Sequence, residues 1–391
     1  MENKRLNIKV LMIDSLAGND YCFILSNHLS QLSVEVTLII NKDRMINIPH
    51  NFRILQLSPS KHPGKNKIIK FFEYIVFLLK IFTLAHRYKI DIIHFQFFRR
   101  ARIETLFCLL LKIRKIILIN TVHDVLPLNQ SKIDRFFKYI NYITFDHLLV
   151  HSKFNQDQLI NQFKISKNKI SIIPHGNFDD YLHAKQISVH MSKKFLGINK
   201  EDHVVLFFGN IKKYKGLDML LDAIEMAHIH DDKITLVIAG RCDGKQLSDY
   251  YTDLVSELNK RMKIIFHNKY IPFNDVQIYL KVCDLVVLPY KTISHSGILH
   301  LAFSFGKPVI ATRVGDFHEF VRHKETGYIL KENTVHCLSD TIVKAFTDLN
   351  HLKTMGENAK KLSDNEFSWN SIAERTKSVY EIALNAETEA K

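Results

Sequence analysis

The sequence predicts an α/β protein built from two doubly wound domains, each a parallel sheet with helices on both faces. Short apolar runs of strand length alternate with longer stretches of helical periodicity along most of the chain. This alternation stops in the polar stretch 177–200 and then restarts. A chain of 391 residues exceeds one ordinary core, and a hydrophobic content of 46% suffices to build two.

In the N-terminal half, apolar runs and helical periodicity follow one another in a βαβ order. The expected strands are 8–13, 34–40, 90–95, 116–120, 148–150 and 170–173, and the expected helices are 21–30, one from Ser131, and 155–163. The C-terminal half repeats the pattern with helical stretches between its strands. Its expected strands are 204–208, 234–239, 263–266, 285–288 and 308–312.

The positive charge of the chain is concentrated in its first half. Residues 1–200 hold 30 Lys and Arg against 14 Asp and Glu, whereas residues 201–391 hold 24 against 26. Residues 51–115 alone hold 14 basic and 3 acidic residues, a net +11. Such a one-sided distribution predicts an anionic partner for the N-terminal half, whether membrane, polyphosphate or nucleic acid.

Cysteine usage and terminal composition predict a cytoplasmic setting. The five cysteines are scattered singly, without a CxxC pair or a zinc-ligand spacing. The first residues lack the apolar core and cleavage site of a signal peptide, and we expect no spanning helix. The protein is therefore expected to be soluble or peripheral.

The most informative stretch is 206–222, LFFGNIKKYKGLDMLLD. A buried strand leads into a turn that carries Lys212, Lys213 and Lys215 between Gly209 and Gly216, and a helix follows. Free backbone N–H groups and the helix dipole favour an anion at such a position, most naturally a phosphate. Lysines in a turn are often only solvated, but the flanking glycines and the strand-to-helix position favour a binding site.

Several other enzyme classes lose support because their motifs are absent. Ligands of doubly wound sheets bind beyond the carboxyl ends of the strands, so the loops after strands were searched first. The first such loop contains Gly18 but no GxGxxG, and no GxxxxGK[ST], HExxH or GxSxG occurs. Dinucleotide dehydrogenases, P-loop NTPases, zinc proteases and α/β-hydrolases are therefore disfavoured.

A series of characteristic segments runs over about 147–380: VHSKFNQDQL, ISIIPHG, LFFGNIKKYKGLDMLLDAI, LVIAGR, YIPFNDVQIYLKVCDLVVLPY, GKPVIATRVGDFHEFV, ETGYIL and FSWNSIAERTKSVY. In these segments and in their order the chain resembles the GT-B glycosyltransferases, specifically glycosyltransferase family 4 with its "glycosyl transferases group 1" domain. The resemblance implies two Rossmann-like domains facing a cleft. It assigns 1–180 to acceptor binding and 181–391 to nucleotide-sugar binding, with the last helix crossing back to the N-terminal domain.

The resemblance also implies roles for individual residues. Lys215 and Lys212 would contact the donor diphosphate together with Asn210, which replaces the usual arginine, and with Gly297 and Ile298. Tyr270, Ile271 and Arg241 would hold the nucleobase and ribose, and Ser296 and Glu319 the donor sugar. His123 would act in catalysis with Asp124, although His123 could equally cap a strand end inside the core and Asp124 could cap the next segment. Gly18 would belong to the acceptor loop.

One departure from the family concerns two glutamates that usually precede the G-x-P turn. Counting back from Gly306 places Leu301 at the second position and Ile293 or Ser294 at the first. The family contacts to the ribose and donor sugar must therefore come from elsewhere or be missing. This leaves open whether transfer retains or inverts the anomeric configuration.

The sequence thus predicts a hexosyltransferase-type glycosyltransferase on the cytoplasmic face of the bacterial plasma membrane. The donor would be a UDP- or GDP-sugar and the acceptor a hydroxyl of a glycan or polyprenyl-diphosphate-linked glycan in surface polysaccharide synthesis. No metal or other cofactor is expected, because the lysines can neutralise the diphosphate. The alternative is a non-catalytic glycosyltransferase-like subunit; a nucleic-acid binder is disfavoured.

The segment 68–85, IIKFFEYIVFLLKIFTLA, predicts a largely apolar helix whose charges make membrane insertion costly. Basic residues flank it, including Lys65, Lys67, Arg99 and Arg100. Apolar surface beside cations is typical of proteins that bind an anionic leaflet. The helix either lies at a membrane interface or packs inside the N-terminal domain.

Overall fold

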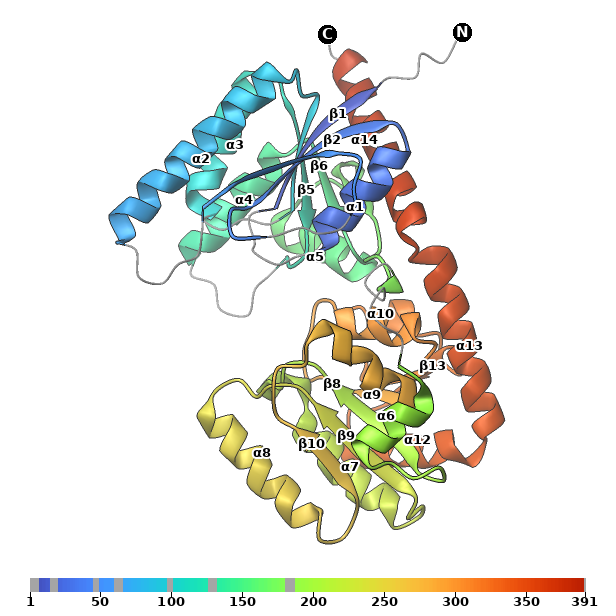
Figure 1. Cartoon of the computed structure of the whole chain (residues 1–391). Helices are drawn as coiled ribbons and strands as arrows, with labels where there is room; N and C mark the ends of the chain where they lie inside the picture. Colours follow the sequence, from blue (N-terminus) through green and yellow to red (C-terminus); the bar gives the residue numbers. More distant parts are fainter. Residues whose placement is uncertain are drawn as a thin grey trace. The chain divides into compact units, whose positions relative to one another are not determined.

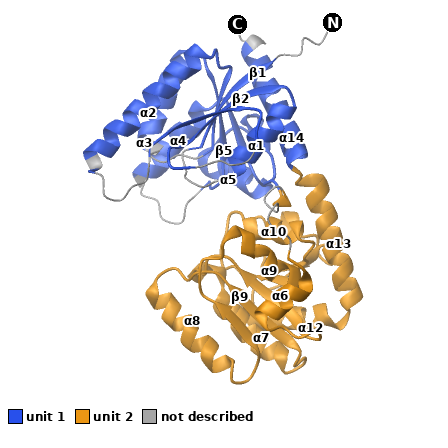
Figure 2. Ribbon diagram, in the orientation of Figure 1, with its two compact units in different colours: residues 1–176, 369–391 blue, residues 177–368 orange. Residues whose placement is uncertain are grey.

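The computed structural model describes residues 7–14, 20–44, 49–59, 66–96, 101–125, 132–179 and 187–389. The chain folds into two compact units, shown in separate colours in Figure 2. Unit 1 comprises residues 1–176 and 369–391, and unit 2 comprises residues 177–368. Each unit is described by itself.

Unit 1 is built on a seven-stranded parallel sheet with the order β3-β2-β1-β4-β5-β6-β7. The strand order reverses beside β1, which pairs with β2 on one side and β4 on the other. Its strands are β1 (Ile8–Ile13), β2 (Val34–Asn41), β3 (Arg53–Ser58), β4 (Ile92–Phe95), β5 (Ile117–Val122), β6 (His147–Val150) and β7 (Ile170–Ile172).

The helices of unit 1 form a layer on each face of this sheet (Figure 1). They are α1 (Asp20–Gln31), α2 (Lys67–Arg87), α3 (Ala101–Ile113), α4 (Lys132–Thr144), α5 (Lys153–Phe163) and α14 (Trp369–Glu389), with the short 3₁₀ turn η1 (Lys167–Lys169). Helices α2 to α5 share one apolar core with β1, β2, β4, β5, β6 and β7. Because parallel crossovers are right-handed, the reversal at β1 places α1 on the opposite face, where it contacts α14.

Unit 2 repeats the plan with six parallel strands in the order β10-β9-β8-β11-β12-β13. The strands are β8 (His203–Phe208), β9 (Ile234–Ala239), β10 (Ile264–His267), β11 (Leu285–Leu288), β12 (Val309–Ala311) and β13 (Gly327–Ile329). The helices are α6 (Val189–Leu196), α7 (Leu217–His228), α8 (Lys245–Leu258), α9 (Val276–Val282), α10 (Gly297–Ser304), α11 (Phe317–Phe320), α12 (Val335–Thr347) and α13 (Leu349–Glu366), with the 3₁₀ turns η3 (Lys213–Lys215) and η4 (Phe273–Asp275).

Strand β8 shows how the unbroken apolar run VVLFF that follows His203 serves both faces of the sheet. Val205 and Phe207 point into a core shared with α7, α8 and α12. Val204, Leu206 and Phe208 point into a second core shared with α6, α9, α10 and α13. A strand covered on both faces needs apolar residues at every position, and this explains why the sequence shows no alternation there.

These two doubly wound sheets confirm the expected fold class, and several elements lie outside the sequence expectation. Strands β3 and β13 and helix α3 were not predicted. Strand β3 mixes two exposed polar residues with three half-buried apolar ones, and β13 is only three residues long. The stretch 177–200, where the alternation stops in the sequence, contains α6. Ser188 caps this helix by accepting a hydrogen bond from the Met191 N–H at 3.2 Å.

Helix α14 belongs to unit 1 although it follows unit 2 in the sequence. Its first residue, Trp369, is buried and lies 5.1 Å from the ring of Tyr21 in α1, measured between centroids. A Cβ atom at Gly176 would lie only 2.4 Å from the Trp369 indole. Position 176 therefore requires glycine. It is the last residue of unit 1 before the chain enters unit 2, and it packs against Trp369, the first residue of unit 1 after the chain returns.

Candidate functional site

The lysine turn of unit 2 lies at the carboxyl end of β8, directly before α7. Gly209 and Gly216 bound it, with φ of 98° and 69°, a region that glycine adopts without strain. Main-chain hydrogen bonds from Gly209 N to Ala239 O and from Ile211 N to Arg241 O, both 2.9 Å, fasten the turn to the end of β9. The turn is therefore part of the sheet edge.

Close backbone packing also fixes the end of the turn. A Cβ atom at Gly216 would lie 2.0 Å from the carbonyl oxygen of Pro289, in the loop after β11. The Lys291 N–H donates to the Tyr214 carbonyl at 2.7 Å, which ties the same two segments together. Because β8 and β11 are neighbours at the point where the strand order reverses, the turn lies where doubly wound sheets bind ligands.

Lys215 is the residue of this turn best placed to bind an anion. Its side chain is only 9% exposed, and its ammonium lies 5.4 Å from the centroid of the Tyr290 ring. Within the described residues, no carboxylate pairs with it and no hydrogen bond compensates it. Burial, with a smaller contribution from the charge of Lys212, lowers the pKa of Lys215 to about 8. A nearly buried ammonium without an anion is expected to gain strongly from a bound one.

The N-terminus of α10 reaches the same place. A Cβ atom at Gly209 would lie 3.3 Å from the Lys215 Nζ and 3.2 Å from the Ile298 Cδ1, so both side chains meet over this glycine. Ser296 is the N-cap of α10, and its side chain does not cap the helix. The start of α10 and the Lys215 ammonium thus lie close together, and the roles of Ser296, Gly297 and Ile298 in binding the donor stay predictions.

A histidine–aspartate pair that the sequence analysis missed braces the loop before α10. The His295 Nδ1 lies 2.7 Å from an Asp316 carboxylate oxygen, and Asp316 is fully buried. A Cβ atom at Gly315 would lie 2.3 Å from the Ile293 carbonyl oxygen. The loop before α10 is therefore held against the turn after β12, which leads into the half-buried Glu319 in α11.

The other predicted donor residues of unit 2 line the same edge of the sheet. Arg241 is exposed after β9, and Tyr270 and Ile271 follow β10, with Tyr270 67% exposed. Lys212 is half-buried and Asn210 exposed, both in the lysine turn. At the positions of the missing glutamates, Leu301 is buried in α10 and Ile293 and Ser294 are half-buried, so no carboxylate stands there.

In unit 1, polar side chains follow four neighbouring strands at the carboxyl edge of the sheet. They are Gln96 after β4, His123 after β5, His151 after β6 and His175 after β7. The His123 Nε2 lies 3.2 Å from the Gln96 Oε1, and its Nδ1 lies 3.0 Å from the His151 Nε2. The His151 Nδ1 in turn lies 3.0 Å from the carbonyl oxygen of Ile173. His123 is therefore held at both ring nitrogens.

Aromatic rings and a deeper histidine enclose this chain of hydrogen bonds. The Tyr21 ring contacts His123, His151 and His175, with centroids 5.3, 5.7 and 5.1 Å away. The Gln96 amide also meets the His94 Nε2 at 3.2 Å. Burial lowers the pKa of His94 to about 3, so that histidine is neutral at ordinary pH.

His123 itself is half-buried, which leaves its imidazole accessible from one side. Asp124 is exposed, and its main-chain carbonyl accepts a hydrogen bond from the Lys138 ammonium at 3.2 Å. Burial lowers the pKa of Lys138 to about 8, with Asp124 opposing the shift. The observed contacts of the His123 ring thus involve Gln96 and His151. Gly18, predicted for the acceptor loop, lies outside the described residues.

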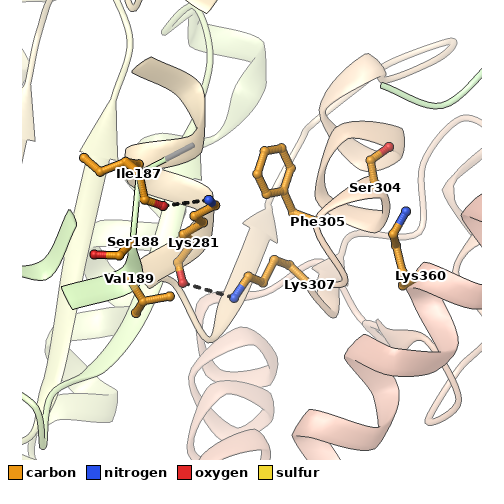
Figure 3. Close-up of a pocket in the computed structure, with 8 residues that line it drawn as sticks. All are labelled: Ile187, Ser188, Val189, Lys281, Ser304, Phe305, Lys307 and Lys360. Atoms are coloured by element: carbon orange, nitrogen blue, oxygen red, sulfur yellow. Dashed lines mark hydrogen bonds between the residues drawn. The ribbon is translucent and has the colours of Figure 1, made fainter. Parts of the chain in front are cut away.

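A separate pocket of unit 2, about 660 Å³ in volume, lies near the amino ends of β11 and β12 (Figure 3). Two of its lysines donate to main-chain carbonyls, Lys281 to Ile187 O at 2.6 Å and Lys307 to Cys283 O at 2.8 Å. The third, Lys360, pairs with Asp179 at 2.9 Å and with Asp364 at 2.5 Å. These cations are already used to fasten the chain. The pocket therefore lies where chain segments of unit 2 are joined, and we do not assign it as a second anion site.

No group of three or more His, Cys, Asp or Glu side chains that could hold a metal ion occurs among the described residues. The same part of the chain contains no helix that is both long enough and apolar enough to cross a bilayer.

Comparison with known proteins agrees with this division of the chain. Residues 19–177 match the family described as Glycosyltransferase Family 4, and residues 189–362 match Glycosyl transferases group 1. D-inositol 3-phosphate glycosyltransferase of Corynebacterium glutamicum (strain R) is 24% identical over 95% of this chain and 93% of its own length.

Solved structures share the fold over nearly the whole chain. A glycosyltransferase from Rickettsia africae ESF-5 superposes with a TM-score of 0.75 at 18% identity, covering 97% of this chain and 99% of its own. The Anabaena protein Alr3699/HepE in complex with UDP superposes with a TM-score of 0.72 at 18% identity, covering 96% and 100%. Both are similar in fold to this chain.

Proposed function

Since the chain is a GT-B glycosyltransferase of the family 4 and group 1 type, we propose that it transfers a sugar from a UDP-sugar or a GDP-sugar to a hydroxyl of a lipid-linked glycan. The observation that carries the donor assignment is the nearly buried Lys215 ammonium beside the start of α10. Solved structures of the Anabaena relative with UDP and UDP-glucose support a nucleotide-diphosphate donor.

In this proposal the bond between the sugar C1 and the diphosphate oxygen breaks while the acceptor hydroxyl bonds to C1. The departing diphosphate gains negative charge, which Lys215, Lys212 and the α10 N–H groups stabilise. His123 hydrogen-bonds to the reacting hydroxyl or accepts its proton at Nε2, which exchanges its contact with Gln96 for the acceptor, while the contact of Nδ1 with His151 keeps the ring in place. We expect the reaction to need no metal ion, because in this proposal the lysines and the helix N–H groups neutralise the diphosphate.

The acceptor and the location rest on the charge and surface of unit 1. A net +11 over residues 51–115 suits a glycan carried on a polyprenyl diphosphate at an anionic leaflet. We therefore place the protein peripherally on the inner face of a bacterial plasma membrane, acting in surface polysaccharide synthesis.

A second candidate is a non-catalytic subunit that keeps the fold and has lost turnover. Leu301 stands in α10 at the position of a family carboxylate, and this substitution favours that candidate. Such a subunit would bind a nucleotide diphosphate without hydrolysing or transferring its sugar.

Calorimetric titration with UDP, GDP and a panel of their sugar conjugates tests the proposal. One nucleotide is expected to bind, and one sugar conjugate is expected to be consumed when a membrane extract supplies the acceptor. Binding without consumption would favour the subunit, and the absence of binding to UDP and GDP alike would overturn the donor assignment.

A further inference from the structure

The exposed apolar side chains of this protein are concentrated on three helices of unit 1. Of 23 large apolar side chains that are exposed among the described residues, 14 belong to α2, α3 and α4. They are Ile68, Ile69, Phe71, Phe72, Val76 and Leu79 on α2, Leu106, Leu109, Leu110 and Ile113 on α3, and Ile133, Phe136, Tyr139 and Ile143 on α4. We call this surface the α2–α4 face.

On each helix these residues form a stripe that points away from the core. On α2, Ile68, Phe72, Val76 and Leu79 recur at helical spacing, and the opposite side buries Tyr74, Phe77, Leu78 and Ile81. The segment 68–85 was predicted either to lie at a membrane interface or to pack inside the domain. In α2 one side of it packs in the core and the other side is exposed.

The three helices already have their packing partners within unit 1. Tyr74 of α2 hydrogen-bonds to the buried Glu104 of α3, and Arg102 of α3 pairs with Asp134 of α4 at 2.8 Å. Figure 1 shows α2, α3 and α4 in the layer on one side of the sheet. The exposed apolar stripes thus lie on the outer surface of this helix layer, and they do not form the contacts between its helices.

Cations accompany this apolar surface. Residues 67–87, 101–115 and 132–144 together hold 11 Lys and Arg against 3 Asp and Glu. Of those three carboxylates, Glu104 is buried and Asp134 is paired with Arg102. Lys80, Arg87, Arg114 and Arg135 are exposed. A partner for this face must therefore offer apolar contact and negative charge at once.

We propose that the α2–α4 face docks onto the anionic surface of a lipid bilayer, with the stripes of all three helices entering the boundary between headgroups and acyl chains. A bilayer accommodates aliphatic and aromatic side chains while its phosphates pair with the surrounding cations. A second copy of the same face would bring like charges together. The proposal deepens the membrane partner named under the proposed function by assigning it a surface.

The test uses the full chain in flotation assays with phosphatidylcholine vesicles and with vesicles that also contain phosphatidylglycerol. Binding is expected only to the anionic vesicles and is expected to weaken steeply with salt. Phe72→Ser, Leu110→Ser and Phe136→Ser, one on each helix, should each weaken binding about ten-fold. Lys80→Ser with Arg114→Ser should lower binding and flatten its salt dependence.

Ile229→Ser is the matched control, because Ile229 is 80% exposed on unit 2. It should bind anionic vesicles as the parent does. The proposal is overturned if the parent ignores anionic vesicles, if neutral vesicles bind equally well, or if Ile229→Ser weakens binding as much as Phe72→Ser. It is also overturned if the three apolar variants instead abolish a dimer seen by analytical ultracentrifugation.

Calorimetry with UDP and GDP on the same variants separates this proposal from the donor assignment. The apolar variants should bind the nucleotide as the parent does. Loss of vesicle binding with intact nucleotide binding would confirm the docking face, whereas intact vesicle binding without any nucleotide binding would sink only the proposed transferase function.

Discussion

The two units share one sheet plan but gather different chemistry at the same edge. In unit 2 the carboxyl ends of the strands hold Lys215, Lys212 and the N-terminus of α10. In unit 1 the corresponding edge holds an amide and three imidazoles, including His123 and His151. Cations and helix N–H groups recognise a fixed negative charge, whereas imidazoles exchange protons near neutral pH. This difference is the basis for our proposal that unit 2 binds the leaving group and that unit 1 handles the acceptor proton.

The sharpest way to break this division is at His123. His123→Ala should lower kcat about 10²-fold or more while leaving nucleotide affinity unchanged. It should also cost about 1–3 kcal/mol of stability, because the buried His151 loses a partner. Steady-state kinetics and thermal melting measure the two effects.

His123→Gln is the matched control for the stability cost, because it keeps a hydrogen-bonding group near His151. Its melting temperature should stay closer to that of the parent while kcat remains low. A near-normal kcat in His123→Gln would show that this side chain only positions its neighbours.

In unit 2, Lys215→Ala should weaken binding of the nucleotide diphosphate by about 1.5–3 kcal/mol, or roughly ten- to a hundred-fold. Lys213→Ala is the matched control, because Lys213 lies in the same turn and is exposed. Calorimetry should show little change for Lys213→Ala. Equal losses in the two variants would mean that the turn acts only through its net charge.

The lowered pKa of Lys215 also has a consequence for folding. Between pH 8 and its ordinary value of 10.5, the unfolded chain binds this proton and the folded chain does not. Stability of the parent should therefore gain about 3 kcal/mol from this group as pH rises through that window. Lys215→Met should remove that gain in chemical denaturation, and an unchanged pH dependence would contradict the burial of a charged ammonium.

The His295–Asp316 pair allows a test of whether the loop before α10 contributes to donor binding. Asp316→Asn should raise KM for the donor about ten-fold, because the loop before α10 loses a charge-assisted contact. The value of kcat should change less than KM. A large loss of kcat at constant KM would place this pair in the chemical step.

The smallest expected effect is that of a chelator. If cations of unit 2 neutralise the diphosphate, EDTA should leave the transfer rate within about two-fold of the untreated enzyme. A complete loss of activity that Mg²⁺ or Mn²⁺ restores would show that the lysines are insufficient.

Much of the fold was predictable because a buried strand can be recognised from a few consecutive apolar residues. The run VVLFF and the glycines around the lysine turn lie within a few residues of one another, so strand, turn and helix could be inferred together. Strand β3 was missed, since its pattern is set by half-exposure at a sheet edge. The outward stripes of α3 and α4 were missed as well, because apolar residues at helical spacing do not reveal which side is covered.

The candidate site was only partly predictable for a related reason. Lys215 and His123 stand in recognisable local motifs, whereas His151 and Gln96 reach His123 through the register of β4, β5 and β6. Each of the two follows a predicted strand, and this position at the carboxyl edge of a parallel sheet was the available signal for a shared site. His295 and Asp316 are 21 residues apart and meet only because β11 and β12 are neighbours.

The return of α14 to unit 1 sets an order of events on the ribosome. Unit 2 is one continuous stretch, so all of its residues have been synthesised before Trp369 emerges. Unit 1 is begun first, yet the Trp369 indole that seals Gly176 and Tyr21 is made only after unit 2 is complete. Residues 1–176 of unit 1 therefore lack the cover of α14 until unit 2 has been synthesised. The half of the protein that is translated first is the last to finish folding.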